Sequence, residues 1–123
     1  MSDNIIKITV STDENHVPTD IVWSAEGGDI KERNAKAMAL AMWDDEDGRL
    51  MNMDLWTKSM SVEEMRHFVC QTMMTLADTF ERSTSDKPHA EALRGFTRAL
   101  AKRIGVMKDD SSGDTKKADS SAL

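Results

Sequence analysis

The residues AMALAMWD (Ala37–Asp44) and RLMNMDLWT (Arg49–Thr57), separated by the turn-forming DEDG at 45–48, decide the fold. If Asp44 pairs with Arg49, the large apolar side chains of both segments gather on one side of a hairpin, namely Met38, Leu40, Met42, Met51, Met53 and Leu55. We therefore predict a hairpin of residues 37–44 and 49–57. A short helical turn at 30–34 is expected to precede it.

A helix is the alternative for part of this stretch. Asp29 could cap a helix through IKERNAKAMALAM (30–42), because Ala, Met, Leu, Lys and Glu all favour helices. Residue propensity and apolar alternation disagree here. The alternation favours the hairpin, and the helix stays open as the second interpretation.

An earlier pair of segments also alternates with the period of a strand. Ile6, Ile8 and Val10 share one side, and Ile21, Trp23 and Ala25 repeat the pattern after the turn-rich run STDENHVPT (11–19). Pairing Val10 with Ile21 places all six on one face. This predicts a first hairpin of residues 4–10 and 20–25.

Two amphipathic helices are predicted downstream. Ser61 and Glu64 form a capping box, and Asp86 with Pro88 begins a second helix. Their apolar stripes are Val62, Met65, Val69, Met73, Leu76 and Phe80, then Leu93, Phe96, Leu100 and Ile104. The predicted fold class is α+β: a four-stranded antiparallel sheet of two hairpins, followed by two helices packed on one face.

Composition indicates one domain in the cytoplasm. Of 123 residues, we expect 1–107 to form a single α+β domain and the polar run 108–123 to be a disordered tail. The net charge of −6 argues against nucleic-acid binding. The sequence begins without a signal-peptide pattern, has no long apolar run and has a single cysteine, Cys70, so we expect no membrane insertion and a reducing compartment.

The polar residues do not form a recognisable catalytic or metal-binding pattern. His16, His67 and His89 lack metal-ligand spacing, and Cys70 lies at the edge of an apolar stripe. The acidic run at 44–47 departs from a calcium loop, because Trp43 occupies the first ligand position. We therefore expect neither an enzyme nor a cofactor.

The second sheet face suggests a protein interface. In the predicted registers this face carries Trp43, Trp56, Leu50, Val22 and Ile5, where a monomer would normally place polar groups. We expect these residues to contact a protein partner or a second copy of the chain. A homodimer is the simplest arrangement.

Several runs resemble one family. They are DENHVP (13–18) followed by Ile21 and Trp23, AKAM (35–38) before Trp43-Asp44, DLWTK (54–58), Gln71-Thr72 and Asp78-Thr79-Phe80. Together they resemble the GldC family. The resemblance implies a cytoplasmic protein associated with bacterial gliding motility, without an assigned catalytic site. The element order is also similar to that of the SecB export chaperone, which makes a peptide-binding module the alternative. An enzyme is the remaining alternative, and it would need an unrecognised pocket that collects His16 or His67 with acidic residues.

Overall fold

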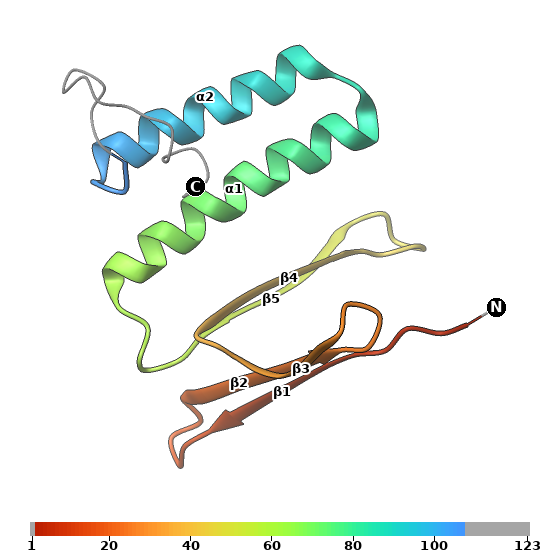
Figure 1. Ribbon diagram of the computed structural model, residues 1–123, viewed down its shortest axis with the longest axis vertical. Coiled ribbons are helices and arrows are strands. Elements are labelled where there is room, and N and C mark those ends of the chain that lie inside the picture. The colour runs from red at the N-terminus through yellow and green to blue at the C-terminus, as the bar shows by residue number, and fades with distance from the viewer. Residues whose placement is uncertain (1, 108–123) are drawn as a thin grey trace. The chain divides into compact units, whose positions relative to one another are not determined.

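The computed structural model describes residues 2–107, and the chain is traced in Figure 1. The elements are β1 (Ile6–Thr12), β2 (Pro18–Ala25), β3 (Ile30–Ala35), β4 (Ala37–Trp43), β5 (Leu50–Trp56), α1 (Val62–Thr84) and α2 (Lys87–Arg103). This composition confirms the α+β class. The chain divides after Met60 into two compact units, a β unit and a helical unit, which are described separately. The single domain predicted over 1–107 stays a prediction, and the predicted tail, 108–123, lies outside the described residues.

The β unit contains two sheets, so the predicted single four-stranded sheet is wrong. One sheet has the order β1-β2-β3, and the other pairs β4 with β5. The predicted helical turn at 30–34 is also wrong, because these residues form β3 and pair with β2, with Ala35 opposite Ile21. The chain bends at Lys36, and β4 then pairs with β5 instead of extending the first sheet.

Both predicted hairpin registers are confirmed. Val10 lies opposite Ile21 and Ile8 opposite Trp23 in the first hairpin. In the second, Met38 lies opposite Leu55 and Met42 opposite Met51, which excludes the helix over 30–42. Apolar alternation specifies these pairings, because a slip of one residue would move every large side chain to the other face.

Both helices begin at the predicted caps. Ser61 Oγ accepts a hydrogen bond from Glu64 N at 3.0 Å, and Ser61 N donates to Glu64 Oε1 at 2.9 Å, which completes the capping box. Ser85 adopts a left-handed conformation (φ 61°) and ends α1. Asp86 Oδ1 then accepts from His89 N at 3.2 Å and caps α2.

Small side chains form the contact between α1 and α2. The buried residues of the helical unit are Cys70, Ala77, Ala90, Thr97 and Ala101. Their steps of seven residues on α1, and of seven and four on α2, make one stripe on each helix. Arg66 Nη1 donates to Ile104 O at 3.1 Å and links the start of α1 to the end of α2.

The larger apolar stripes lie beside this contact. Residues expected to be buried are instead exposed, namely Val62, Val69, Leu76, Leu93 and Phe96. The reason is that small residues, and not the large ones, bring the two helix backbones together. The packing of both helices on one sheet face stays a prediction.

Candidate functional site

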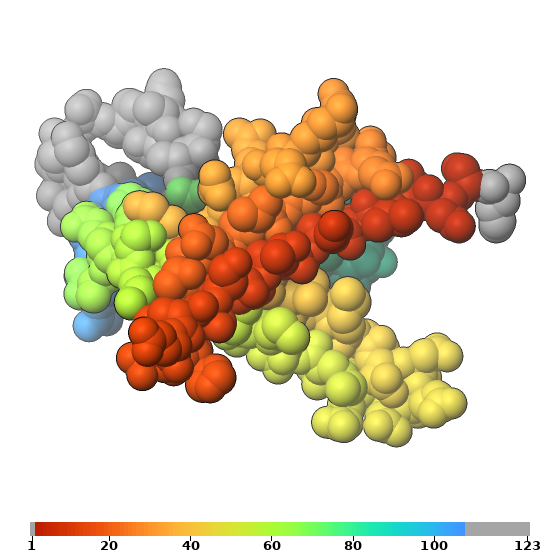
Figure 2. Space-filling model, turned by 90° about the horizontal axis from the view of Figure 1, so that it is seen from below, coloured from red at the N-terminus to blue at the C-terminus, as the bar shows by residue number. Residues whose placement is uncertain are grey.

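The β4–β5 hairpin exposes apolar side chains on both faces. On one face Trp43 is 71% exposed, Leu50 54% and Trp56 57%. The other face carries Met42, Met51 and Met53, which are also exposed although the sequence indicated an inward orientation. Figure 2 shows the turn of this hairpin, in yellow, projecting from the β unit. Large exposed apolar side chains gathered on one hairpin favour a binding surface.

The five residues predicted to form the interface are divided between two sheets. Trp43 and Leu50 are a cross-strand pair, and Trp56 lies on the same face of the hairpin, opposite Ala37. Val22 is half-buried in β2, and the exposed Ile5 immediately precedes β1. The structure therefore places Trp43, Leu50 and Trp56 on one face of the hairpin, with Trp56 at the opposite end from the other two, while Val22 lies in the three-stranded sheet and Ile5 just before it. We call Trp43, Leu50 and Trp56 the tryptophan face.

Two of the sequence runs quoted above meet at the base of this hairpin. Lys58 Nζ lies 2.8 Å from Asp13 Oδ2, and Lys58 N donates to Pro18 O at 3.1 Å. Asp13 Oδ1 also accepts from the backbone N–H groups of Asn15 and Val17, at 2.8 and 3.1 Å. Sequence reasoning missed this junction because its residues are far apart along the chain.

The electrostatics of the junction keep Asp13 ionised. The hydrogen bond from Lys58 and the backbone N–H of Val17 lower the pKa of Asp13 to about 2. The carboxylate is therefore charged at neutral pH. It ties the β1–β2 loop to the end of β5, so the junction positions the hairpin and its tryptophan face.

The β unit also contains an apolar groove of about 380 Å³. Its lining comes from β1, β2, the end of β3, and β4, and comprises Ile6, Ile8, Ile21, Trp23, Ala35, Ala37, Met38, Ala39 and Leu40. The groove has the volume and apolar character of a site for hydrophobic side chains. It is the second candidate surface of this unit.

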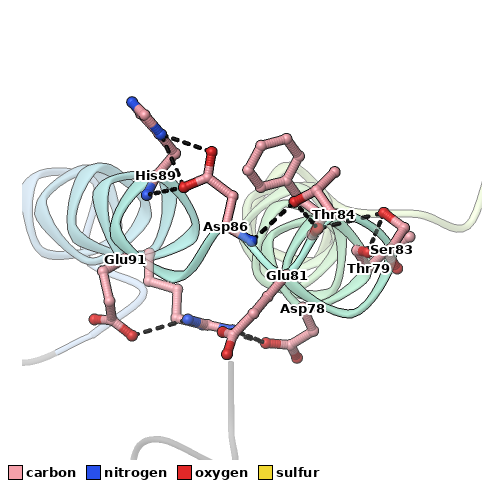
Figure 3. A network of polar contacts seen from close by, with 10 residues as sticks. Asp78, Thr79, Glu81, Ser83, Thr84, Asp86, His89 and Glu91 are labelled. Atoms are coloured by element: carbon pink, nitrogen blue, oxygen red, sulfur yellow. Dashed lines mark hydrogen bonds and ion pairs between the residues drawn. The ribbon is translucent and has the colours of Figure 1, made fainter.

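The most polar cluster of the helical unit is an ion-pair network. Arg94, whose side chain is 14% exposed, lies 2.8 Å from carboxylate oxygens of Asp78, Glu81 and Glu91. Figure 3 shows the acidic groups converging from both helices. Hydrogen bonds to Asp78 and Glu81 raise the pKa of Arg94. These carboxylates are paired with the protein's own guanidinium, so the cluster is a structural link between α1 and α2. A hollow of about 670 Å³ lies beside it.

The predicted polar candidates remain apart. His16 lies in the β1–β2 loop, His67 on α1 and His89 on α2, where the His89 ring contacts Asp86 at 2.8 Å (Figure 3). That hydrogen bond lowers the pKa of Asp86. Burial raises the pKa of the fully buried Cys70 thiol, which favours the unreactive thiol form. Across residues 2–107, no His, Cys, Asp or Glu side chains cluster in threes that could hold a metal ion.

The acidic run forms the hairpin turn. Asp44 N donates to Arg49 O at 2.9 Å, and Asp44 Oδ2 accepts from Asp47 N at 2.8 Å. Gly48 takes the left-handed conformation (φ 60°) that this turn requires. The carboxylates thus border the tryptophan face at its tip.

Comparison with known proteins gives one match. The sequence model of a family described as gliding motility-associated protein GldC-like matches residues 18–106. The matched range contains the DLWTK run, the β4–β5 hairpin and both helices. No curated protein and no solved structure matches the chain. In the part of the chain that the structure describes, neither helix has the length and apolar character needed to cross a membrane.

Proposed function

We propose that this chain, which belongs to the GldC-like family of gliding-motility-associated proteins, acts by binding protein chains and not by catalysis. The observation that carries the proposal is the exposure of Trp43, Leu50 and Trp56 on one face of the β4–β5 hairpin. Leaving apolar area in water costs about 25 cal/mol per Å². Contact with another chain would remove this cost.

The chemistry of the hairpin suits a protein interface. Tryptophan is enriched among the residues that contribute most to binding energy, and such residues are usually surrounded by a polar rim. Here the acidic turn at 44–47 lies beside Trp43 and Leu50, and Asn52 and Asp54 share their face. We infer an accessory or scaffold role, through self-association as a homodimer or through a partner protein.

We further propose that the protein works in the cytoplasm and without a cofactor. A thiol such as Cys70 stays reduced in that compartment. The polar clusters of the structure support structural roles, since Asp13 is engaged by Lys58 and Arg94 by three carboxylates.

We expect Trp43→Glu combined with Trp56→Glu to abolish association. Charged side chains on the tryptophan face would have to be desolvated in an interface without a matching partner. Light scattering across concentration should show the parent rising from the 13.7 kDa monomer toward twice that mass, with the double variant remaining monomeric. The matched control, Thr79→Glu with Ala92→Glu, adds the same charge at exposed helical positions and should behave as the parent.

Affinity capture tests whether the tryptophan face binds a different protein. Protein captured by the parent from the native cell, and lost with the tryptophan double variant, would be a partner of this face. A parent that stays monomeric and captures nothing in a tryptophan-dependent manner would contradict the proposal.

A chaperone-like peptide-binding module is the second candidate, favoured by the apolar groove of about 380 Å³. This function would use the groove and not the tryptophan face. Two results would favour the peptide-binding function. The tryptophan double variant would still bind extended apolar peptides, and Ile8→Glu in the groove would lose this binding.

A further inference from the structure

The outer edges of the three-stranded sheet are protected against pairing with another chain. β1 carries Lys7, and its pairing with β2 shifts register between Ser11 and Thr12. β3 carries three consecutive charged residues at 31–33 and faces a shift in β2 after Trp23. Charged side chains and bulges are the usual means by which proteins keep exposed strand edges from pairing.

Both edges of the two-stranded sheet lack these features, and β5 is the more exposed strand, with six of its seven residues exposed against four of seven in β4. Its pairing with β4 runs without a shift from Ala37–Trp56 to Trp43–Leu50. Its sequence, LMNMDLW, has one charged residue, Asp54, and contains neither Lys nor Pro. Within residues 2–107 its other edge has no strand partner. An isolated two-stranded hairpin is marginal in water, and a third strand would stabilise it.

Among the described residues, the backbone groups of β5 without a strand partner belong to alternate positions. Asp44 N donates to Arg49 O at 2.9 Å, and Thr57 N donates to Lys36 O at 2.8 Å, so positions 49 and 57 face β4. Along an antiparallel strand, the backbone N–H and C=O groups of successive residues point alternately to one neighbouring strand and to the other. The N–H and C=O groups that point to the open edge are therefore those of Leu50, Asn52, Asp54 and Trp56.

We propose that β5 pairs along this edge with β5 of a second copy, antiparallel and centred on Met53; the inference rests on the proposed binding role of the hairpin. A two-fold axis at Met53 sets Leu50 opposite the partner's Trp56, and Asn52 opposite the partner's Asp54. These residues carry the outward backbone groups, so each such pair exchanges two hydrogen bonds. The product is a four-stranded sheet in the order β4-β5-β5-β4.

The side chains match in this register. On the tryptophan face, Trp43 and Leu50 continue into the partner's Trp56 as one apolar row across three strands. Asn52 lies opposite the partner's Asp54, an amide facing a carboxylate. Asn52 Nδ2 already donates to Asp54 Oδ2 at 3.1 Å within one strand, so the two groups are compatible. Cross-strand pairs of these kinds stabilise sheets.

Neighbouring registers match less well. A slip of two residues in one direction places Asp54 opposite the partner's Asp54, where like charges repel. The opposite slip places Leu50 beside the partner's Asp54.

Site-specific cross-linking tests the register. In full-length protein carrying Cys70→Ala, which removes the only native thiol, we expect Met53→Cys to form disulfide-linked dimers under mild oxidation. The introduced thiols would face each other across the two-fold axis, at a spacing that permits a disulfide. Non-reducing gel electrophoresis gives the linked fraction.

The matched controls are Met51→Cys and Leu55→Cys on the same face of the same strand. In each, the two thiols of a dimer would lie about 14 Å apart along the strand, four residues at about 3.4 Å each. That distance exceeds disulfide geometry. We expect at least about tenfold slower linking than with Met53→Cys, an order-of-magnitude expectation from this separation. Mixing the two control proteins should restore linking, since position 51 lies opposite the partner's position 55.

The outcomes separate this inference from the proposed function. Suppose that the parent is a dimer that is lost on Trp43→Glu with Trp56→Glu, but that disulfide linking is equal or absent at all three cysteine positions. That result would overturn the register and leave the binding role intact. A parent that is monomeric and shows no preference for Met53→Cys would overturn the pairing. The binding role would then depend on tryptophan-dependent capture of a different protein.

Discussion

Ile21→Ala should lower the free energy of unfolding by about 2–5 kcal/mol, the range for truncating a buried aliphatic side chain. Ile21 is 2% exposed and lies on β2, the central strand of its sheet, opposite Val10 and Ala35. Its side chain also lines the apolar groove, so truncation removes methyl groups and leaves a cavity. Urea unfolding followed by circular dichroism measures the change.

The matched control is Ile6→Ala in the same sheet. Ile6 points to the same face as Ile21 but is 68% exposed, so the substitution should change stability by no more than about 0.5 kcal/mol. Losses of equal size in the two variants would show that Ile21 is not the centre of the packing.

Ala77→Leu should cost about 1–3 kcal/mol through overpacking. Ala77 is fully buried, and it lies between Cys70 and Glu81 on the stripe of α1 that faces α2. A larger side chain there must separate the helices. That separation would lengthen the contacts of Arg94 with Asp78 and Glu81, both 2.8 Å.

Ala99→Leu provides the comparison on α2. Ala99 is exposed, so the added methyl groups meet solvent and the expected change is within about 0.5 kcal/mol. Thermal and urea unfolding of both variants give the difference. A tolerated Ala77→Leu, with unchanged unfolding, would rule out close helix packing at that position.

The features that local sequence determines were predictable. The hairpin registers follow from apolar alternation, in which Val10–Ile21 and Met42–Met51 each collect large side chains on one face. The capping box of Ser61 and the start of α2 at Asp86 follow from the hydrogen-bonding needs of helix ends.

The features that depend on tertiary context were not predictable. β3 has the sequence IKERNA, whose charges do not indicate a strand, and it forms because its backbone pairs with β2. That pairing and the bend at Lys36 divide the expected four-stranded sheet into two. The helix contact was missed because Ala and Cys add little to an apolar stripe in sequence.

The candidate site was predicted in part. Trp43, Leu50 and Trp56 share a face because strand alternation and one register determine it. Val22 and Ile5 were grouped with them only through the assumption of a single sheet. The exposure of Met51 and Met53 on the opposite face has no sequence signal, because the same residues would serve equally well in a core.

Residue-resolved amide hydrogen exchange of the parent, compared between a dilute and a concentrated solution, is the direct test of whether β5 pairs with a second copy. We expect the amides of Leu50, Asn52, Asp54 and Trp56 to exchange more slowly as concentration rises, because they pair with a second copy. Met51, Met53 and Leu55, whose amides face β4, should be protected at both concentrations. The four outward amides could instead exchange fast, and independently of concentration, in a sample that light scattering shows to be dimeric. That result would contradict pairing through β5.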